Sequence, residues 1–261
     1  MNVYGKNLKT LSSNMDYEMI DDVLNFHNKS NILIDKKFYS CIAPYALSYD
    51  QLKSLERSDY EISPFYSDNI ECNSSENNSI RRNHTAVSFA HQKISFSSLT
   101  KLLNQSFSDD NGHRPYPSAG ALYPVEVLCY IFSEKLHNSP PSGIYHYRPL
   151  HRVLQPLKKI KSEQMRDAIY SLELEPVKEP SFAFLYIAVL EKMLVKYRYR
   201  GYRYALMEAG AMFQQADLVS QSLGLINKLY SGFNDHEIVK CCGIDGMNFI
   251  PLVVQSFGVP L

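Results

Sequence analysis

Three short apolar runs restrict the fold of this 261-residue chain more than any other feature. They are residues 126–132 (EVLCYIF), 182–190 (FAFLYIAVL) and 250–257 (IPLVVQSF), each of strand length and rich in β-branched and aromatic side chains. Runs this continuously apolar are typical of central strands that other elements cover on both faces. The segment that begins at Ile144, IYHYRPLHRVLQPL, predicts two further strands joined by a short turn that contains a proline.

Helical spacing alternates with these strands. Apolar residues three and four apart predict a long helix over residues 204–223, which Gly224 ends. The same spacing predicts shorter helices at residues 99–103, after a serine cap signal at 97–98, and at residues 165–172. Helices mixed with mostly non-adjacent strands indicate an α+β domain.

A polar segment divides the chain into two parts. Residues 67–79 (SDNIECNSSENNS) have the Asn- and Ser-rich composition of an exposed linker. Apolar patterns in residues 1–66 are too sparse for a large independent core, so we expect a small N-terminal docking or lid region there. Residues 80–261 should then form the main domain.

Composition excludes several classes of partner. Lys plus Arg and Asp plus Glu both number 27, so the whole chain offers no electrostatic attraction to nucleic acid or an anionic membrane. No secretory signal or membrane-spanning run is evident. We expect a reduced, cytoplasmic compartment and no metal site, because the cysteines are odd in number and form no C-x-x-C pair: Cys41, Cys72, Cys129, Cys241 and Cys242.

Two segments contain residues of the types found in ligand-binding or catalytic sites. In HRPYPSAGALYPVEV, residues 113–127, prolines rigidify a small-residue centre that lets backbone approach a flat ligand, although an ordinary loop entering a strand has a similar composition. In KYRYRGYR, residues 196–203, basic and aromatic residues alternate. That pattern fits a solvated charged turn, or less well a surface for single-stranded nucleic acid.

Both segments carry a specific family resemblance. The string RPYPSAGALYPVEV from Arg114 is similar to the signature of SagB-type azoline dehydrogenases of the nitroreductase superfamily. Residues 191–225 resemble the Lys-Tyr segment and following helix of the dehydrogenase subunit of microcin-B-type thiazole/oxazole synthetases, and the two blocks occur in the same order. The similarity runs from about residue 80 to the end, and more weakly through residues 26–31.

The resemblance implies a nitroreductase-like, FMN-binding fold with a central mixed β-sheet flanked by helices. It also implies a homodimer with the flavin at the subunit interface. The chain matches the superfamily's phosphate motif only in part, at residues 81–85, and it lacks the basic residues that many nitroreductases carry after the last strand. The flavin-binding residues that it implies are Arg81, Arg82, Arg114, Pro117, Ser118, Ala119, Gly120, Ser231 and Gly232. From the residues alone, the arginine pair fits a solvated surface and Ser231-Gly232 an ordinary turn.

The resemblance also points to Lys196 and Tyr197 as catalytic residues. Azoline oxidation removes a proton from one ring carbon and a hydride from the next, so it needs a base that faces an electron acceptor. Because free tyrosine ionises only near pH 10, a tyrosine base needs a neighbouring cation. We therefore expect Tyr197 as the base and Lys196 as its activator, or the reverse. The pair cannot act jointly from a regular strand, where neighbours point to opposite faces. Glu208 is expected to hold one of these cations or to form a structural ion pair.

The function expected is oxidation of thiazoline and oxazoline rings on a ribosomal precursor peptide during microcin-like antibiotic or toxin biosynthesis. By resemblance, the chain should act beside a cyclodehydratase and a peptide-binding partner subunit. Two alternatives remain: a non-catalytic scaffold subunit of the heterocyclase complex, which the incomplete phosphate motif favours, and a general FMN-dependent nitro or quinone reductase.

Overall fold

The computed structural model describes residues 16–28, 82, 85–170 and 180–261. All of these belong to one compact unit. The expected linker at 67–79 and Arg81 lie outside the described residues, so the division of the chain at that linker stays a prediction.

The centre of this unit is a six-stranded sheet in the order β5-β4-β2-β6-β8-β7. The strands match the predicted ones: β2 (Val125–Ile131), β4 (Gly143–Arg148), β5 (Val153–Lys159), β6 (Phe182–Val189), β7 (Ile226–Tyr230) and β8 (Phe249–Gly258). Of these strands, only β7 was not singled out in the sequence.

The sheet is antiparallel at every described pairing, so the expectation of a mixed sheet is wrong. Among the described strands, parallel pairing occurs only between β1 (Ile94–Ser95) and β3 (Leu136–His137), outside this sheet. The apolar runs did not reveal the direction of the strands because an antiparallel sheet covered on both faces needs the same continuous burial. The predicted α+β class is confirmed.

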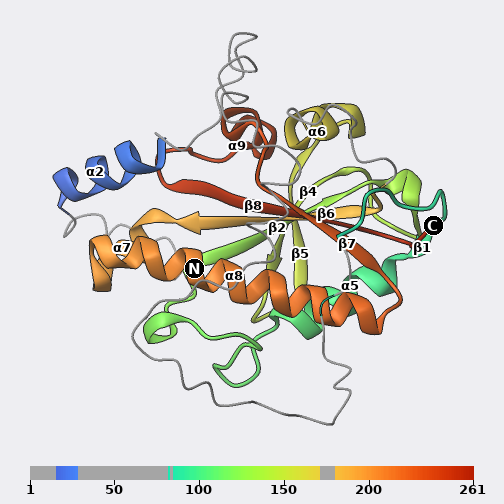
Figure 1. Ribbon diagram of the computed structural model, residues 1–261, viewed down its shortest axis with the longest axis horizontal. Coiled ribbons are helices and arrows are strands. Elements are labelled where there is room, and N and C mark those ends of the chain that lie inside the picture. The colour runs from blue at the N-terminus through green and yellow to red at the C-terminus, as the bar shows by residue number, and fades with distance from the viewer. Residues whose placement is uncertain (1–15, 29–81, 83–84, 171–179) are drawn as a thin grey trace, which may run out of the picture. The chain divides into compact units, whose positions relative to one another are not determined.

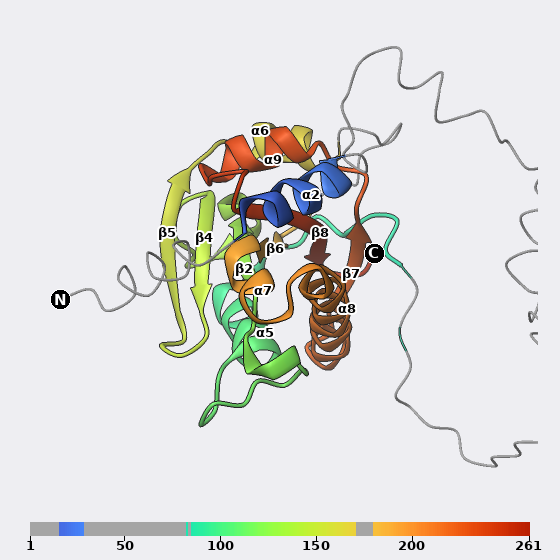
Figure 2. The same cartoon turned by 90° about the vertical axis from the view of Figure 1, so that its left-hand side faces the viewer.

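Helices cover both faces of the sheet (Figures 1 and 2). On one face, α5 (Phe96–Phe107) and α8 (Tyr199–Ser222) pack on a core that includes Val127 and Cys129 of β2, and Met19 and Val23 of α2 (Tyr17–Asn28) join the same core. On the other face, α6 (Ser162–Ile169) and α9 (Asp235–Cys242) pack on a core that includes Leu128 and Tyr130. This alternation along β2, and burial of every residue of β6, place the sheet between two helical layers.

The helix boundaries differ slightly from those predicted. The long helix α8 begins at Tyr199, earlier than expected, and it is followed by Gly224 at φ +70°. The N-cap of α5 is Ser95, whose hydroxyl accepts a hydrogen bond from the Ser97 amide at 3.1 Å, so the cap lies before the predicted serine pair. No helix in the described part of the chain is long and apolar enough to span a membrane.

Candidate active site

A sharp turn between two helices positions Lys196 and Tyr197. Helix α7 (Leu190–Tyr197) ends at Tyr197, Arg198 adopts φ 50° and ψ −139°, and α8 begins at the next residue. The two helices cross so closely at Gly201 that a Cβ there would lie 2.0 Å from the Met193 carbonyl oxygen. The catalytic candidates therefore lie on the last turn of a helix, which meets the requirement that they not lie on a regular strand.

The Lys-Tyr pair meets the small-residue loop at Gly120. A Cβ built on Gly120 would lie 2.6 Å from the Tyr197 hydroxyl and 2.8 Å from Lys196 Nζ. The Tyr197 ring packs edge-to-face on Tyr204, with ring centroids 5.0 Å apart. Two sequence blocks that lie far apart along the chain thus meet at Gly120, where an added Cβ would displace the Tyr197 hydroxyl and the Lys196 ammonium.

The loop that brings Gly120 to this point has an unusual backbone. Residues Ala119–Ala121 form a single 3₁₀ turn, η1, and Gly120, Ala121 and Tyr123 have φ values of 61°, 54° and 47°. Non-glycine residues in this left-handed region cost about 1 to 3 kcal/mol each and persist only where the surrounding structure holds them. Such strain is concentrated at functional sites.

Glu208 holds this loop from α8. Its buried carboxylate accepts hydrogen bonds from the Ser118 hydroxyl and, at 3.2 Å, from the Val125 amide. Burial raises the pKa of Glu208 to about 7, and the two hydrogen bonds and the charges of Lys192 and Arg114 oppose this rise only in part. The expected ion pair is wrong: among the described residues no cation lies in ion-pair contact with Glu208. The Glu208 side chain lies on the face of α8 that packs against the protein interior, so it is shielded from solvent.

A second glutamate near the site, the half-buried Glu126, was not singled out in the sequence. Glu126 of β2 accepts hydrogen bonds from Lys192 and His146, each at 3.1 Å. Burial alone would raise its pKa, but the hydrogen bonds and charges of His146 and Lys192 outweigh burial and lower the pKa to about 2. The available signal was a single acidic residue in an otherwise apolar strand, and its partners come from distant segments.

Arg114 packs against two aromatic side chains of the same segment, Tyr116 and Tyr123. Its guanidinium lies 4.2 Å above the Tyr123 ring, donates to the Tyr116 hydroxyl at 3.0 Å and has Nε 4.0 Å from Asp109. These contacts stabilise the loop. Pro117 beside it is exposed and Ala119 is half-buried.

Arg82 lies away from the loop. It donates a hydrogen bond to Thr85 at 2.8 Å and has Nε 4.0 Å from Asp217 of α8, with 49% of its side chain exposed. Asp217 follows Glu208 by nine residues, or about two and a half turns, so the contacts of Arg82 and of the loop fall on opposite sides of α8. Within one chain, Arg82 and Gly120 do not meet.

Ser231 and Gly232 also lie apart from the loop. They follow β7 directly, and the next residue, Phe233, is buried in the core beneath α6 and α9. The loop is bound to α8, on the other face of the sheet. The structure therefore brings together Ser118, Gly120, Lys196 and Tyr197, and leaves Arg82 and the Ser-Gly pair at separate places. Among the described residues, no group of three or more His, Cys, Asp or Glu side chains is arranged to hold a metal.

Comparison with known proteins agrees with this architecture. The model of the nitroreductase family matches residues 80–259. The chain is 36% identical over 248 residues to the microcin B17-processing protein McbC of Escherichia coli, covering 93% of this chain and 91% of that protein. A chain in the solved structure of the E. coli microcin synthetase McbBCD complex with truncated pro-MccB17 bound has a TM-score of 0.88 and 34% identity, with 96% of each chain covered. The predicted resemblance is confirmed, and this chain belongs to the nitroreductase family of oxidoreductases.

Proposed function

We propose that this chain is an FMN-dependent dehydrogenase that oxidises thiazoline and oxazoline rings on a ribosomal precursor peptide to thiazoles and oxazoles. Its similarity to a microcin B17-processing protein over most of both chains supports this substrate class. The observation that carries the proposal is the convergence of the Tyr197 hydroxyl and Lys196 ammonium at Gly120 in a chain with that similarity. The product would be a microcin-like antibiotic or toxin.

The chemistry assigns a separate task to each side chain. Oxidation of the ring removes a proton from the α-carbon and a hydride from the β-carbon; bound FMN supplies the two-electron acceptor. Tyr197 takes the proton, and the Lys196 ammonium stabilises the negative charge that Tyr197 carries as a base. With molecular oxygen as the final acceptor, one azoline and one oxygen molecule give one azole and one hydrogen peroxide.

The residues present fit a flavin. Arg82 uses only part of its five N–H donors in contacts with Thr85 and Asp217, and half of its side chain is exposed, so it suits the phosphate together with Arg81. The loop from Pro117 to Gly120 suits the flat ring system because its small residues let backbone approach closely. Ser231 and Gly232 would supply backbone amides, while Arg114 would support the loop.

We propose a homodimer because one chain does not gather all of these residues. The loop and the Ser231-Gly232 pair belong to opposite faces of the sheet, so a second copy is needed to complete each flavin site. The dimer would act in the cytoplasm, beside cyclodehydratase and peptide-binding subunits. The similarity to a chain of the McbBCD complex supports this assembly.

Anaerobic reduction of the flavin-loaded protein tests this function against its alternatives. An azoline-containing peptide should bleach the visible flavin absorbance, whereas a nicotinamide donor should not. Bleaching by nicotinamide alone would indicate a general nitro or quinone reductase. A protein that binds no FMN, and whose partner subunits never yield azoles, would indicate a scaffold subunit.

A further inference from the structure

One buried carboxyl group fastens both ends of the loop that carries Gly120. Glu208, with 3% of its surface exposed, accepts from the Ser118 hydroxyl at the start of the loop. Its other oxygen accepts from the Val125 amide at the end of the loop, 3.2 Å away. The Ser118 oxygen in turn accepts from the Tyr123 amide at 2.8 Å, so the carboxyl and the hydroxyl together fix three points of one short segment.

The loop needs this restraint because its backbone is strained. Ala121 and Tyr123 hold positive φ values of 54° and 47°, a conformation that L-residues with a side chain rarely adopt. Such conformations persist only where neighbouring contacts over-determine them. If the Glu208 contacts were lost, the segment between Ser118 and Val125 would relax toward ordinary backbone angles.

Relaxation of the loop would move Gly120, which lies against the side-chain ends of Lys196 and Tyr197. Gly120 stands so close to the Tyr197 hydroxyl and Lys196 Nζ that a Cβ would lie 2.6 Å and 2.8 Å from them. The Tyr197 ring is held on another side by Tyr204. Glu208 itself forms no hydrogen bond with either member of the pair among the described residues, so it acts on them only through the loop.

We infer that Glu208 is a positioning residue for azoline oxidation: its carboxyl holds the 118–125 loop in the conformation that fixes the Tyr197 hydroxyl and the Lys196 ammonium. This inference rests on the proposed function for its kinetic consequence. Its structural consequence, a displaced Tyr197 hydroxyl, does not depend on that function.

The first test measures the Tyr197 hydroxyl without any turnover. In protein with isotopically labelled tyrosine ring carbons, the Tyr197 signal is assigned by its loss in Tyr197→Phe. Glu208→Gln should shift this signal in the flavin-free protein, because an NH₂ group, which only donates, replaces one of the two oxygens that accept separately from Ser118 and Val125. Glu134→Gln, which removes a carboxylate from the opposite end of β2, should leave it unmoved. An unmoved Tyr197 signal in folded Glu208→Gln would overturn the inference even if the chain proves not to oxidise azolines.

The second test is a kinetic double-mutant cycle in flavin-loaded protein. Glu208→Gln should slow azole formation about 10- to 100-fold, since small misplacements of catalytic groups cost factors of this size. In a Tyr197→Phe background the same change should cost less than about threefold, because residues that act as one unit are not additive. Full multiplication of the two effects would mean that Glu208 acts independently of the pair.

Ser118→Ala provides a second variant in case Glu208→Gln does not fold. It removes the same tie from the loop side and leaves the Val125 contact in place. It should shift the Tyr197 signal in the same direction, and a folded Ser118→Ala protein with an unshifted signal would also overturn the inference. An inactive wild-type protein with bound flavin would contradict the proposed function alone.

Discussion

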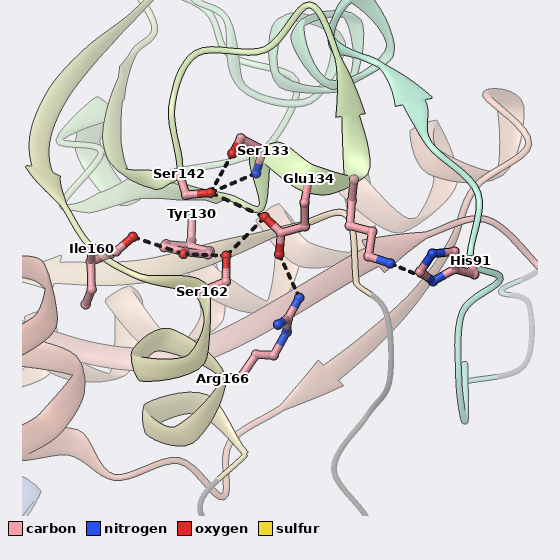
Figure 3. Close-up of polar contacts among 9 residues, drawn as sticks. His91, Tyr130, Ser133, Glu134, Ser142, Ile160, Ser162 and Arg166 are labelled. Atoms are coloured by element: carbon pink, nitrogen blue, oxygen red, sulfur yellow. Dashed lines mark hydrogen bonds and ion pairs between the residues drawn. The ribbon is translucent and has the colours of Figure 1, made fainter.

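A glutamate connects each end of strand β2 to a helix through hydrogen bonds, and the surroundings of the two glutamates differ. At its start, Glu208 reaches in from α8, buried and without an ion pair in the described part of the chain. After its end, Glu134 in the 3₁₀ turn η2 (Ser133–Lys135) accepts from Arg166 at 2.9 Å and from Ser162 at 3.1 Å, both of α6 (Figure 3). Glu134 keeps 43% of its side chain exposed.

The remaining contacts around Glu134 have the same structural character. Figure 3 shows Ser142 joining Glu134 to the Ser133 amide and hydroxyl. Beside this cluster, Lys135 Nζ lies 2.9 Å from His91 Nδ1. The cluster fastens η2 to α6 with an arginine as counterion, in contact with solvent that screens the charge.

The difference between the two glutamates appears in their protonation. Partial burial opposes ionisation of Glu134, but hydrogen bonds from its own backbone and Ser162 and the Arg166 charge outweigh burial and lower its pKa. Burial dominates at Glu208 and raises its pKa to about 7. A carboxyl kept in so costly an environment, where it restrains a strained loop, is the pattern expected at a functional site rather than at a structural tie.

The largest predicted effect is on the rate of azole formation, which should depend on the residues at the start of β2 and not on those after its end. Tyr197→Phe keeps the ring and its contact with Tyr204, so folding and FMN content should survive, while the rate of azole formation should fall about a hundredfold to ten-thousandfold. Lys196→Ala should cause a similar loss, and Glu134→Gln should stay within about twofold of wild type. Mass spectrometry of timed reactions measures the rate. Wild-type rates in both catalytic variants would redirect the search for a base to Tyr199, Tyr202 or His113.

Two glycines at positive φ allow the effect of backbone strain to be separated from the effect of side-chain contact. Gly120→Ala and Gly112→Ala both place a side chain at positive φ, 61° and 84°, but a Cβ at Gly112 would meet nothing within 4 Å. Each variant should lose about 1 kcal/mol of unfolding free energy. Only Gly120→Ala should slow azole formation, by about 10- to 100-fold, because it displaces the Lys-Tyr pair. Equal rates in the two variants would show that contact at Gly120 is irrelevant.

The two glutamates should also change stability with pH in opposite directions. Folding raises the pKa of Glu208 from 4.5 to about 7, so its contribution is fully present below pH 4.5 and is lost as the pH rises to about 7, by up to about 3 kcal/mol. Folding lowers the pKa of Glu134, so its contribution is present above pH 4.5 and is lost as the pH falls. Urea unfolding of wild type, Glu208→Gln and Glu134→Gln at several pH values gives both difference curves, and curves of the same sign would contradict this assignment.

The smallest predicted effect concerns the flavin phosphate. The surface contact of Arg82 with Asp217 should contribute under about 1 kcal/mol to folding, so Arg82→Ala should leave the fold intact. If Arg82 binds the phosphate, the variant should bind FMN more weakly by about 1 to 3 kcal/mol. Lys101→Ala, which removes one exposed charge from α5, is the matched control. Flavin titration decides, and equal affinities in all three proteins would place the phosphate elsewhere.

The sequence predicted most strands and the long helix because burial makes apolar residues recur at the spacing of a strand or a helix. This spacing is visible in a single sequence. Through family resemblance alone, the sequence also assigned Lys196 and Tyr197 to catalysis and Ser118–Gly120 to flavin binding. That these residues meet at Gly120 depends on the crossing of α7 and α8, which the sequence does not reveal. The role of Glu208 was missed because a charge on a helix predicts a cation partner. Its partners are instead a hydroxyl and an amide, which the sequence does not mark as ligands. Strand direction was missed because burial does not encode it.

The mass of the product peptide shows directly whether this chain oxidises azoline rings. A precursor peptide is treated with the cyclodehydratase and peptide-binding subunits, with and without this chain loaded with FMN, under air. Each cyclisation removes one water and each oxidation removes two hydrogens, so the two steps are read separately. Peptide treated without the chain should lose water only, and adding the chain should remove two further hydrogens per ring. If a flavin-loaded chain leaves the water-loss product unchanged, it is not an azoline dehydrogenase.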